Sequence, residues 1–184
     1  MSRASRAVVG VVLAVGLAAA TTGGRAHGAP DWQSFRHPSQ GFSISYPRGW
    51  ETLSGTGQAS FVAIGPTVAG APGTRMVVVV VAAPLPRGAT LEDAESSIQA
   101  NLSRSGQPTN VLRHDRFSLR GTPAFLIYLH RKNPQGVELY QMVMVLMHRG
   151  RGFGVAGSTA AASSSLTEDT RLLQSILLTF RPLR

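Results

Sequence analysis

The chain is a basic protein of 184 residues, with 18 Lys and Arg against 9 Asp and Glu and a formal net charge of +9. Hydrophobic residues make up 43% of it, which excludes a wholly disordered chain and is enough for a packed core. It contains no cysteine, so disulfides, thiolate zinc sites, cysteine nucleophiles and lipid-modified cysteines are all excluded.

Residues 1–28 have the pattern of a secretory signal peptide. Two arginines precede a charge-free apolar run over residues 7–20, which is too short to cross a bilayer as a helix. Cleavage after Gly28 fits the small residues that follow this run, and cleavage after Ala26 is the close alternative. We therefore expect export to the periplasm or the extracellular space, with a retained membrane anchor as the other interpretation, and a single mature domain over residues 29–184.

The mature sequence opens with short strands. Phe42, Ile44 and Tyr46 alternate with small polar residues, which predicts a half-buried strand with these three side chains inward. The turn residues after it predict a return strand over residues 50–53, and a third strand follows over residues 61–64.

Two later segments are apolar on both faces. Residues 76–83 are apolar at every position and rich in valine, and residues 137–148 are largely apolar. β-branched side chains favour a strand over a helix. A strand without a polar face must be covered on both sides, so we expect both segments in the interior of a sheet.

Two helices are predicted, one in the middle of the chain and one at its end. Thr90 begins the first, which ends near Gly106, and Ser165 and Glu168 form a capping box for the second, which stops before Pro182. About seven strands joined by short turns, with two helices, predict an α+β fold: one antiparallel sheet with a helix on each face, in a monomer. The remaining strand candidates are residues 110–119, 124–131 and 153–158.

No catalytic motif is found in the sequence. Residues 152–157 match G-x-G-x-x-G, but the further strand and acidic residue of a dinucleotide site do not follow. Glu51, Asp115 and Glu138 are the carboxylates left for acid–base chemistry, and they show no partner arrangement. We therefore expect no enzyme, cofactor or metal site, with an unrecognised hydrolase as the least favoured alternative.

The basic residues do not indicate nucleic-acid binding. All of them except Lys132 are arginine, without a basic helical stripe or interleaved aromatic residues. One polar pair is possible: a hairpin that aligns Arg131 with Val137 would place His130 opposite Glu138. This pair would be half of a metal site or an ordinary surface pair, and we favour the surface pair.

Residues 41–50 carry a resemblance to a known family. They read Gly-Phe-Ser-Ile-Ser-Tyr-Pro-Arg-Gly-Trp and resemble the G-F-S-I-x-Y-P-x-G-W opening of PsbP-like domains, relatives of the extrinsic PsbP subunit of photosystem II. Weaker landmarks follow in order: an acidic helix start at residues 90–94, a turn at 119–124 and an I-L-x-x-F close at 176–180. The resemblance implies an antiparallel sheet between helices and an exported protein that acts by binding.

We therefore expect a non-catalytic accessory module that docks on a protein or a membrane-associated partner, with membrane contact at most peripheral. The alternative is a carrier of a small apolar or amphipathic ligand. Its ligand would occupy a cavity between sheet and helix, lined by Met142, Met144 and Leu146.

The predicted topology also gathers basic residues at one end of the sheet. Because consecutive strands alternate in direction, the turns at residues 120–123 and 149–152 should lie at the same end. The one acid assigned nearby, Asp115, is about 17 Å back along its strand. A positive rim of this kind would attract phosphate head groups or an acidic protein face, and a solvated turn is the alternative. The four residues of this rim are Arg120, His148, Arg149 and Arg151.

Overall fold

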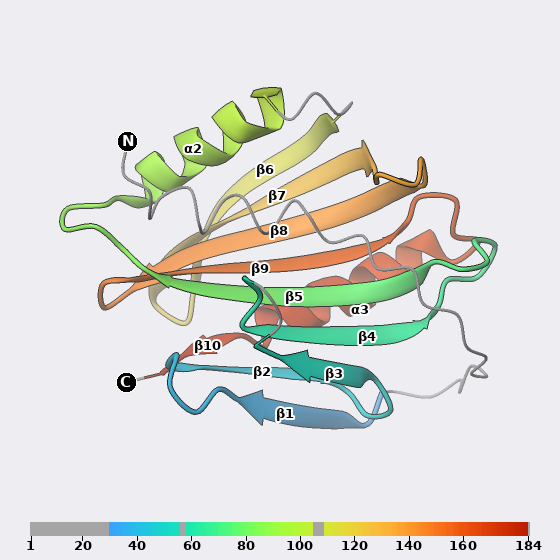
Figure 1. Ribbon diagram of the computed structural model, residues 1–184, viewed down its shortest axis with the longest axis horizontal. Coiled ribbons are helices and arrows are strands. Elements are labelled where there is room, and N and C mark those ends of the chain that lie inside the picture. The colour runs from blue at the N-terminus through green and yellow to red at the C-terminus, as the bar shows by residue number, and fades with distance from the viewer. Residues whose placement is uncertain (1–29, 56–57, 105–108, 184) are drawn as a thin grey trace.

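The computed structural model describes residues 30–55, 58–104 and 109–183. The expected signal peptide and the expected helix end at Gly106 lie outside these ranges. Within them the chain forms ten strands and two helices (Figure 1). The elements are β1 (Trp32–Arg36), β2 (Phe42–Pro47), β3 (Glu51–Ser54), β4 (Phe61–Thr67), β5 (Arg75–Pro84), α2 (Leu91–Arg104), β6 (Thr109–Leu119), β7 (Thr122–Lys132), β8 (Glu138–His148), β9 (Arg151–Ala160), α3 (Leu166–Leu178) and β10 (Arg181–Pro182).

A seven-stranded antiparallel sheet forms the centre of the fold, in the order β3-β4-β5-β9-β8-β7-β6. The two segments predicted as interior strands are β5 and β8, and each has a strand on both sides. Strand β6, which carries several charged residues, lies at one edge. The sequence prediction of an antiparallel sheet with these interior strands is confirmed.

The two helices cover opposite faces of this sheet (Figure 1). On one face Val78 belongs to a buried cluster with Leu173 of α3. On the other face Val79 belongs to a separate cluster with Ile98 and Leu102 of α2. Successive valines of β5 therefore face different helices, which is why the segment has no polar face. No helix in the described part of the chain is long and apolar enough to cross a membrane.

A second, three-stranded sheet in the order β1-β2-β10 was not predicted. Phe42, Ile44 and Tyr46 of β2 are buried as expected. The predicted return strand is wrong in its pairing, because β3 pairs with β4 at the edge of the large sheet. Both edges of β2 are instead occupied by β1 and β10.

Aromatic packing explains why these two strands join β2. From β1, Phe35 stacks on Phe61 of the large sheet with ring centroids 4.3 Å apart. Just before β10, Phe180 stacks on Phe42 at 5.6 Å. Burial of these rings stabilises the small sheet against the large one. Strand β3 instead pairs with β4 and forms one edge of the large sheet.

The glycines of residues 152–157 belong to β9 and not to a phosphate-binding loop. Gly157 faces α3: a Cβ atom there would lie 3.1 Å from Leu177 and 3.3 Å from Leu173. Glycine at this position therefore permits α3 to lie close against the sheet.

The start of α2 has the predicted capping pattern. The Oγ1 of Thr90 accepts a hydrogen bond from the backbone N–H of Asp93 at 3.1 Å. The carboxylate of Asp93 in turn accepts one from the backbone N–H of Thr90 at 2.9 Å. These reciprocal bonds satisfy N–H groups that the helix itself leaves unpaired.

The predicted capping box of α3 is wrong. Ser165 makes no side-chain capping hydrogen bond, and Glu168 is exposed. The carboxylate of Asp169, one residue later, is buried and accepts hydrogen bonds from the hydroxyls of Ser163 at 2.6 Å, Ser165 at 3.3 Å and Thr159 at 3.3 Å. A buried acceptor that binds three hydroxyls replaces the exposed capping box.

Candidate functional site

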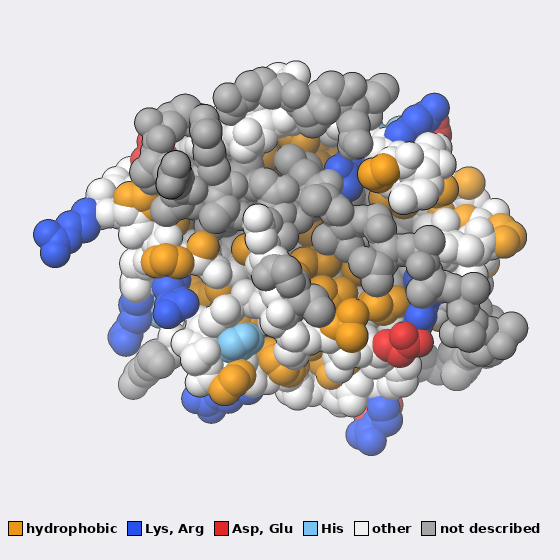
Figure 2. All heavy atoms as spheres, in the orientation of Figure 1, with side chains coloured by type: hydrophobic (Ala, Val, Ile, Leu, Met, Phe, Trp, Pro, Cys, Tyr) orange, Lys and Arg blue, Asp and Glu red, His pale blue; other side chains and the backbone are white. Residues whose placement is uncertain are grey.

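The four basic residues expected to gather do lie at one end of the seven-stranded sheet. Ala124 of β7 pairs with Leu146 of β8, so the β6–β7 turn and the β8–β9 turn both lie beyond this end of the two strands. Figure 2 shows Lys and Arg side chains at the left end of the molecule, where Figure 1 places the same turns. We call this set, Arg120, His148, Arg149 and Arg151, the arginine rim.

The two rim turns have an unusual backbone. Each is a two-residue loop with positive φ at both positions: 52° at Arg120 and 81° at Gly121, then 48° at Arg149 and 73° at Gly150. These are type I′ hairpin turns, whose first position normally holds Asn, Asp or Gly. Among the described residues, Arg120 and Arg149 are the only non-glycine residues with positive φ.

The three rim arginines, Arg120, Arg149 and Arg151, form no ion pair with any acid in the described ranges. Two acids open α2, which begins at the same end of the sheet (Figure 1). Glu92 lies 3.7 Å from Arg116, and Asp93 accepts the hydrogen bonds of the helix cap. The rim therefore keeps its positive charge.

The β1–β2 hairpin extends this positive end. Arg36 and Arg181 both pair with Ser43 across the small sheet, one from each side. His37 follows in the β1–β2 turn, and its pKa is lowered mainly by burial and secondly by the charge of Arg151. The electrostatic effect of Arg151 on His37 links the small sheet to the rim.

The structure does not bring the three candidate acid–base carboxylates together. They lie on β3, β6 and β8, and β3 and β6 are opposite edges of the large sheet. Each forms its own ion pair with a different cation. Among the described residues, no group of three His, Asp or Glu side chains is placed to hold a metal ion. The pairs are Glu51–Arg75 at 2.9 Å, Asp115–Arg113 at 2.7 Å and Glu138–Lys132 at 3.6 Å.

The predicted hairpin register around His130 is wrong by two residues, because Lys132 rather than His130 lies opposite Glu138. The turn sets this register: Asn133 donates its backbone N–H to the carbonyl of Val137 at 2.9 Å. His130 still lies diagonally 3.6 Å from Glu138, and both side chains are partly exposed. The geometry is that of a surface pair.

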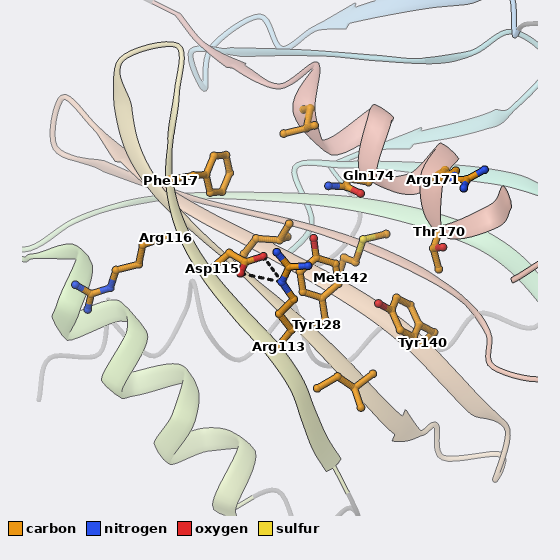
Figure 3. A pocket seen from close by; sticks show the side chains of 13 residues that line it. Arg113, Asp115, Arg116, Phe117, Tyr128, Tyr140, Met142, Thr170, Arg171 and Gln174 are labelled. Carbon is orange, nitrogen blue, oxygen red and sulfur yellow. Dashed lines mark hydrogen bonds and ion pairs between the residues drawn. The ribbon is translucent and has the colours of Figure 1, made fainter. Parts of the chain in front are cut away.

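A groove of about 590 Å³ lies on the α3 face, between this helix and strands β6, β7 and β8 (Figure 3). Helix α3 packs mainly over β9 and partly over β8, and the groove opens beside it over β7 and β6. Of the three residues expected to line a cavity, Met142 lines the groove. Met144 and Leu146 are buried in the core and do not line it.

The groove contains a cation held in place by its neighbours. Asp115 accepts hydrogen bonds from the Nε of Arg113, with oxygen distances of 2.7 and 2.9 Å. The guanidinium carbon of Arg113 lies 5.7 Å from the centre of the Tyr128 ring, within cation–π range. Burial is the main cause that raises the pKa of Tyr128 and of Tyr140, so both hydroxyls are protonated at neutral pH. Figure 3 shows these side chains between β6 and α3.

Sequence reasoning missed this arrangement. Arg113 lies opposite Tyr128 because a register shift occurs between Val111 and Arg113 of β6. No turn residue marks this bulge in the sequence. The position of α3, which decides where the groove opens, depends on packing against β9.

No protein-family model matches the sequence, and no curated protein matches it. Solved structures match at low sequence identity. PsbP (CyanoP) from Synechocystis sp. PCC 6803 is 16% identical with a TM-score of 0.62, over 89% of this chain and 98% of that chain.

Two further solved structures are similar. The Ran-binding protein Mog1p of Saccharomyces cerevisiae is 11% identical with a TM-score of 0.58, over 84% of this chain and 97% of that chain. LpqN of Mycobacterium tuberculosis, described as involved in cell envelope biogenesis, is 15% identical with a TM-score of 0.55, over 83% of this chain and 91% of that chain. The resemblance carried by residues 41–50 is thus confirmed at the level of architecture, and the chain has the PsbP-like fold.

Proposed function

We propose that this chain is an exported, non-catalytic binding module that docks on an acidic face of a partner protein through the arginine rim. The observation that carries the proposal is the placement of arginine at the first position of both type I′ turns. A non-glycine residue with positive φ is strained, and Asn or Gly would relieve the strain. Arginine at both positions is explained if the guanidinium groups are needed there.

The charge of the rim supports an anionic partner. Its three arginines have no acidic partner in the described parts of the chain, whereas Arg48, Arg75, Arg113 and Arg116 each have at least one. An unpaired guanidinium offers two parallel donors that fit a carboxylate. Several such groups at one end of a molecule steer an acidic surface toward it.

The distribution of apolar side chains favours a protein partner over a membrane. Surfaces that bind lipid combine basic residues with exposed apolar side chains that enter the bilayer. None of the large exposed hydrophobic residues in the described ranges belongs to the rim turns. These residues are Trp32, Leu53, Val111, Leu112 and Leu178.

The fold and the sequence support the other parts of the proposal. Mog1p, which shares the fold, is a Ran-binding protein, so the architecture can serve as a protein-binding scaffold. LpqN is involved in cell envelope biogenesis, which is compatible with export of a chain of this fold. Export itself rests on the signal-peptide pattern of residues 1–28. Non-catalytic action is supported by the separate ion pairs of Glu51, Asp115 and Glu138.

The test measures binding of residues 29–184 to immobilised poly-L-glutamate at several salt concentrations. The rim variant carries Arg120→Asn, Arg149→Asn and Arg151→Gln, because Asn suits positive φ and preserves the turns. The control variant loses three cations elsewhere, through Arg48→Gln, Arg104→Gln and Lys132→Gln. We expect the parent to bind with a steep salt dependence and the rim variant to lose about tenfold or more in affinity, with an unchanged melting temperature.

Two outcomes would overturn the proposal. The first is equal binding of the parent and the rim variant at low salt. The second concerns vesicles of phosphatidylcholine with phosphatidylglycerol. If binding to these vesicles depends on the rim and binding to poly-L-glutamate does not, the rim is a membrane-binding surface. Cross-linking of the parent in its own envelope extends the test, since a genuine partner must be lost with the rim variant and kept with the control.

A further inference from the structure

Arg113 is oriented by its neighbours but leaves part of its guanidinium unused. The carboxylate of Asp115 accepts hydrogen bonds only from the Nε of Arg113, and the Tyr128 ring lies beside the guanidinium. The two terminal amino groups of Arg113 make no hydrogen bond to any described residue. A guanidinium fixed through Nε, with its amino groups open to a groove, is prepared for an anion of fork-like geometry.

Further uncommitted donors surround the same groove. The hydroxyls of Tyr128 and Tyr140 and the side-chain amide of Gln174 make no hydrogen bond within the described ranges, and all three residues line the groove. Figure 3 shows Gln174 reaching from α3 toward the side where Arg113 lies. Of the arginines in the lining, Arg116 is paired with Glu95 of α2, which leaves Arg113 and Arg171 against the single carboxylate of Asp115. This excess of cations favours an anionic ligand.

The rest of the groove is apolar. Phe117 lies at one end and Tyr140 at the other, with Met142 between them (Figure 3). Leu112 and Leu178 also line it, and they are 50% and 40% exposed. The groove thus combines donors with apolar side chains along its length, and its volume of about 590 Å³ is in the range of small-molecule sites.

We propose that this groove binds a single-chain amphiphile with an anionic head group. The carboxylate or phosphate of the head binds the terminal amino groups of Arg113 and accepts hydrogen bonds from the tyrosine hydroxyls. The alkyl chain lies on Met142 and extends toward Phe117 and Leu178. This proposal is independent of the arginine rim, whose residues do not line the groove.

The first test is calorimetric titration of residues 29–184 with alkyl carboxylates below their micelle concentrations. We expect affinity to rise with chain length, by at most about fourfold for each added methylene that is buried. Dodecanoate should bind more tightly than dodecanol, because only the carboxylate engages Arg113. Dodecyl phosphate in a parallel titration distinguishes a phosphate-bearing ligand from a fatty acid. If neither anion binds more tightly than dodecanol, the proposed head-group site is wrong.

The second test uses matched variants. Arg113→Gln should weaken dodecanoate about tenfold and leave dodecanol unchanged. Arg48→Gln is its control, because Arg48 is likewise 67% exposed and likewise binds an aspartate through Nε. Leu178→Asp should weaken binding of every alkyl ligand. Leu53, which is 41% exposed on β3, is the control, and Leu53→Asp should leave binding unchanged. Unchanged dodecanoate affinity in Arg113→Gln or in Leu178→Asp, with the fold intact, would overturn the proposal.

Discussion

Asp169 and Glu168 are adjacent acids in the first turn of α3 with very different surroundings. Asp169 is 5% exposed and accepts from three hydroxyls, whereas Glu168 is exposed. We expect Asp169→Ala to lower the free energy of unfolding by about 2 kcal/mol, because the buried hydroxyl of Thr159 and the partly buried hydroxyls of Ser163 and Ser165 lose their acceptor. Glu168→Ala should change it by less than about 0.5 kcal/mol. Urea unfolding measures both, and equal losses would contradict the difference expected from the burial of the two acids.

His37 makes the stability of the small sheet sensitive to pH. Its Nδ1 accepts hydrogen bonds from the backbone N–H groups of Ser39 at 3.2 Å and Gln40 at 3.1 Å, which requires that this nitrogen carry no proton. Burial first, and the charge of Arg151 second, lower the pKa of His37 below 6.5. The folded-state pKa therefore lies below the unfolded one. The contribution of His37 to stability is present above the unfolded-state pKa and is lost as the pH falls through the folded-state pKa.

We expect an NMR titration of His37 to give a pKa below 6.5, and Arg151→Gln to raise it. Arg48→Gln, which removes a cation that pairs with Asp31 instead, should leave the value unchanged. A titration of His37 that is identical in the parent and in Arg151→Gln would show that the rim does not act on this turn.

At the scale of elements, the sequence predicted which segments form strands better than it predicted which strands pair with each other. The apolar composition of residues 76–83 requires cover on both faces, and this requirement alone places β5 inside the sheet. The turn residues after β2 predict that the chain changes direction there. They do not show that β1 and β10 already pair with both edges of β2. The arginine rim could be predicted, because short turns make consecutive strands alternate in direction. The groove could not, because it depends on the packing of α3 and on a bulge in β6.

The position of β5 leads to a prediction at this scale. Val79 is 2% exposed and faces α2, whereas Val111 on the edge strand β6 is 47% exposed. We expect Val79→Asp to unfold the domain, because an unpaired buried charge costs several kcal/mol. Val111→Asp should leave the melting temperature within a few degrees of the parent. Thermal melts followed by circular dichroism compare the two, and a Val79→Asp protein that melts with the parent would refute the interior position.

At the scale of the whole molecule, β1 connects the first described residues of the chain to both sheets. Asp31, just before β1, binds Arg48 through its carboxylate at 2.6 Å, and its backbone carbonyl accepts a hydrogen bond from the backbone N–H of Arg48 at 2.7 Å. Phe35 of β1 then stacks on Phe61 of β4. The segment from residue 31 onward is therefore part of the fold, and we expect any signal-peptide cleavage before it.

Cleavage after Gly28 satisfies this condition, as does cleavage after Ala26. We expect intact-mass spectrometry of the exported protein to show an N-terminus at Ala29, or at His27 for the alternative site, with full stability in either case. A variant that begins at residue 37 lacks β1 and should have a lower melting temperature. The deletion removes the Phe35 ring that stacks on Phe61 and exposes one edge of β2. Detection of intact Met1 in the exported protein would contradict signal-peptide cleavage, and an unchanged melting temperature after the truncation would show that β1 contributes little to the fold.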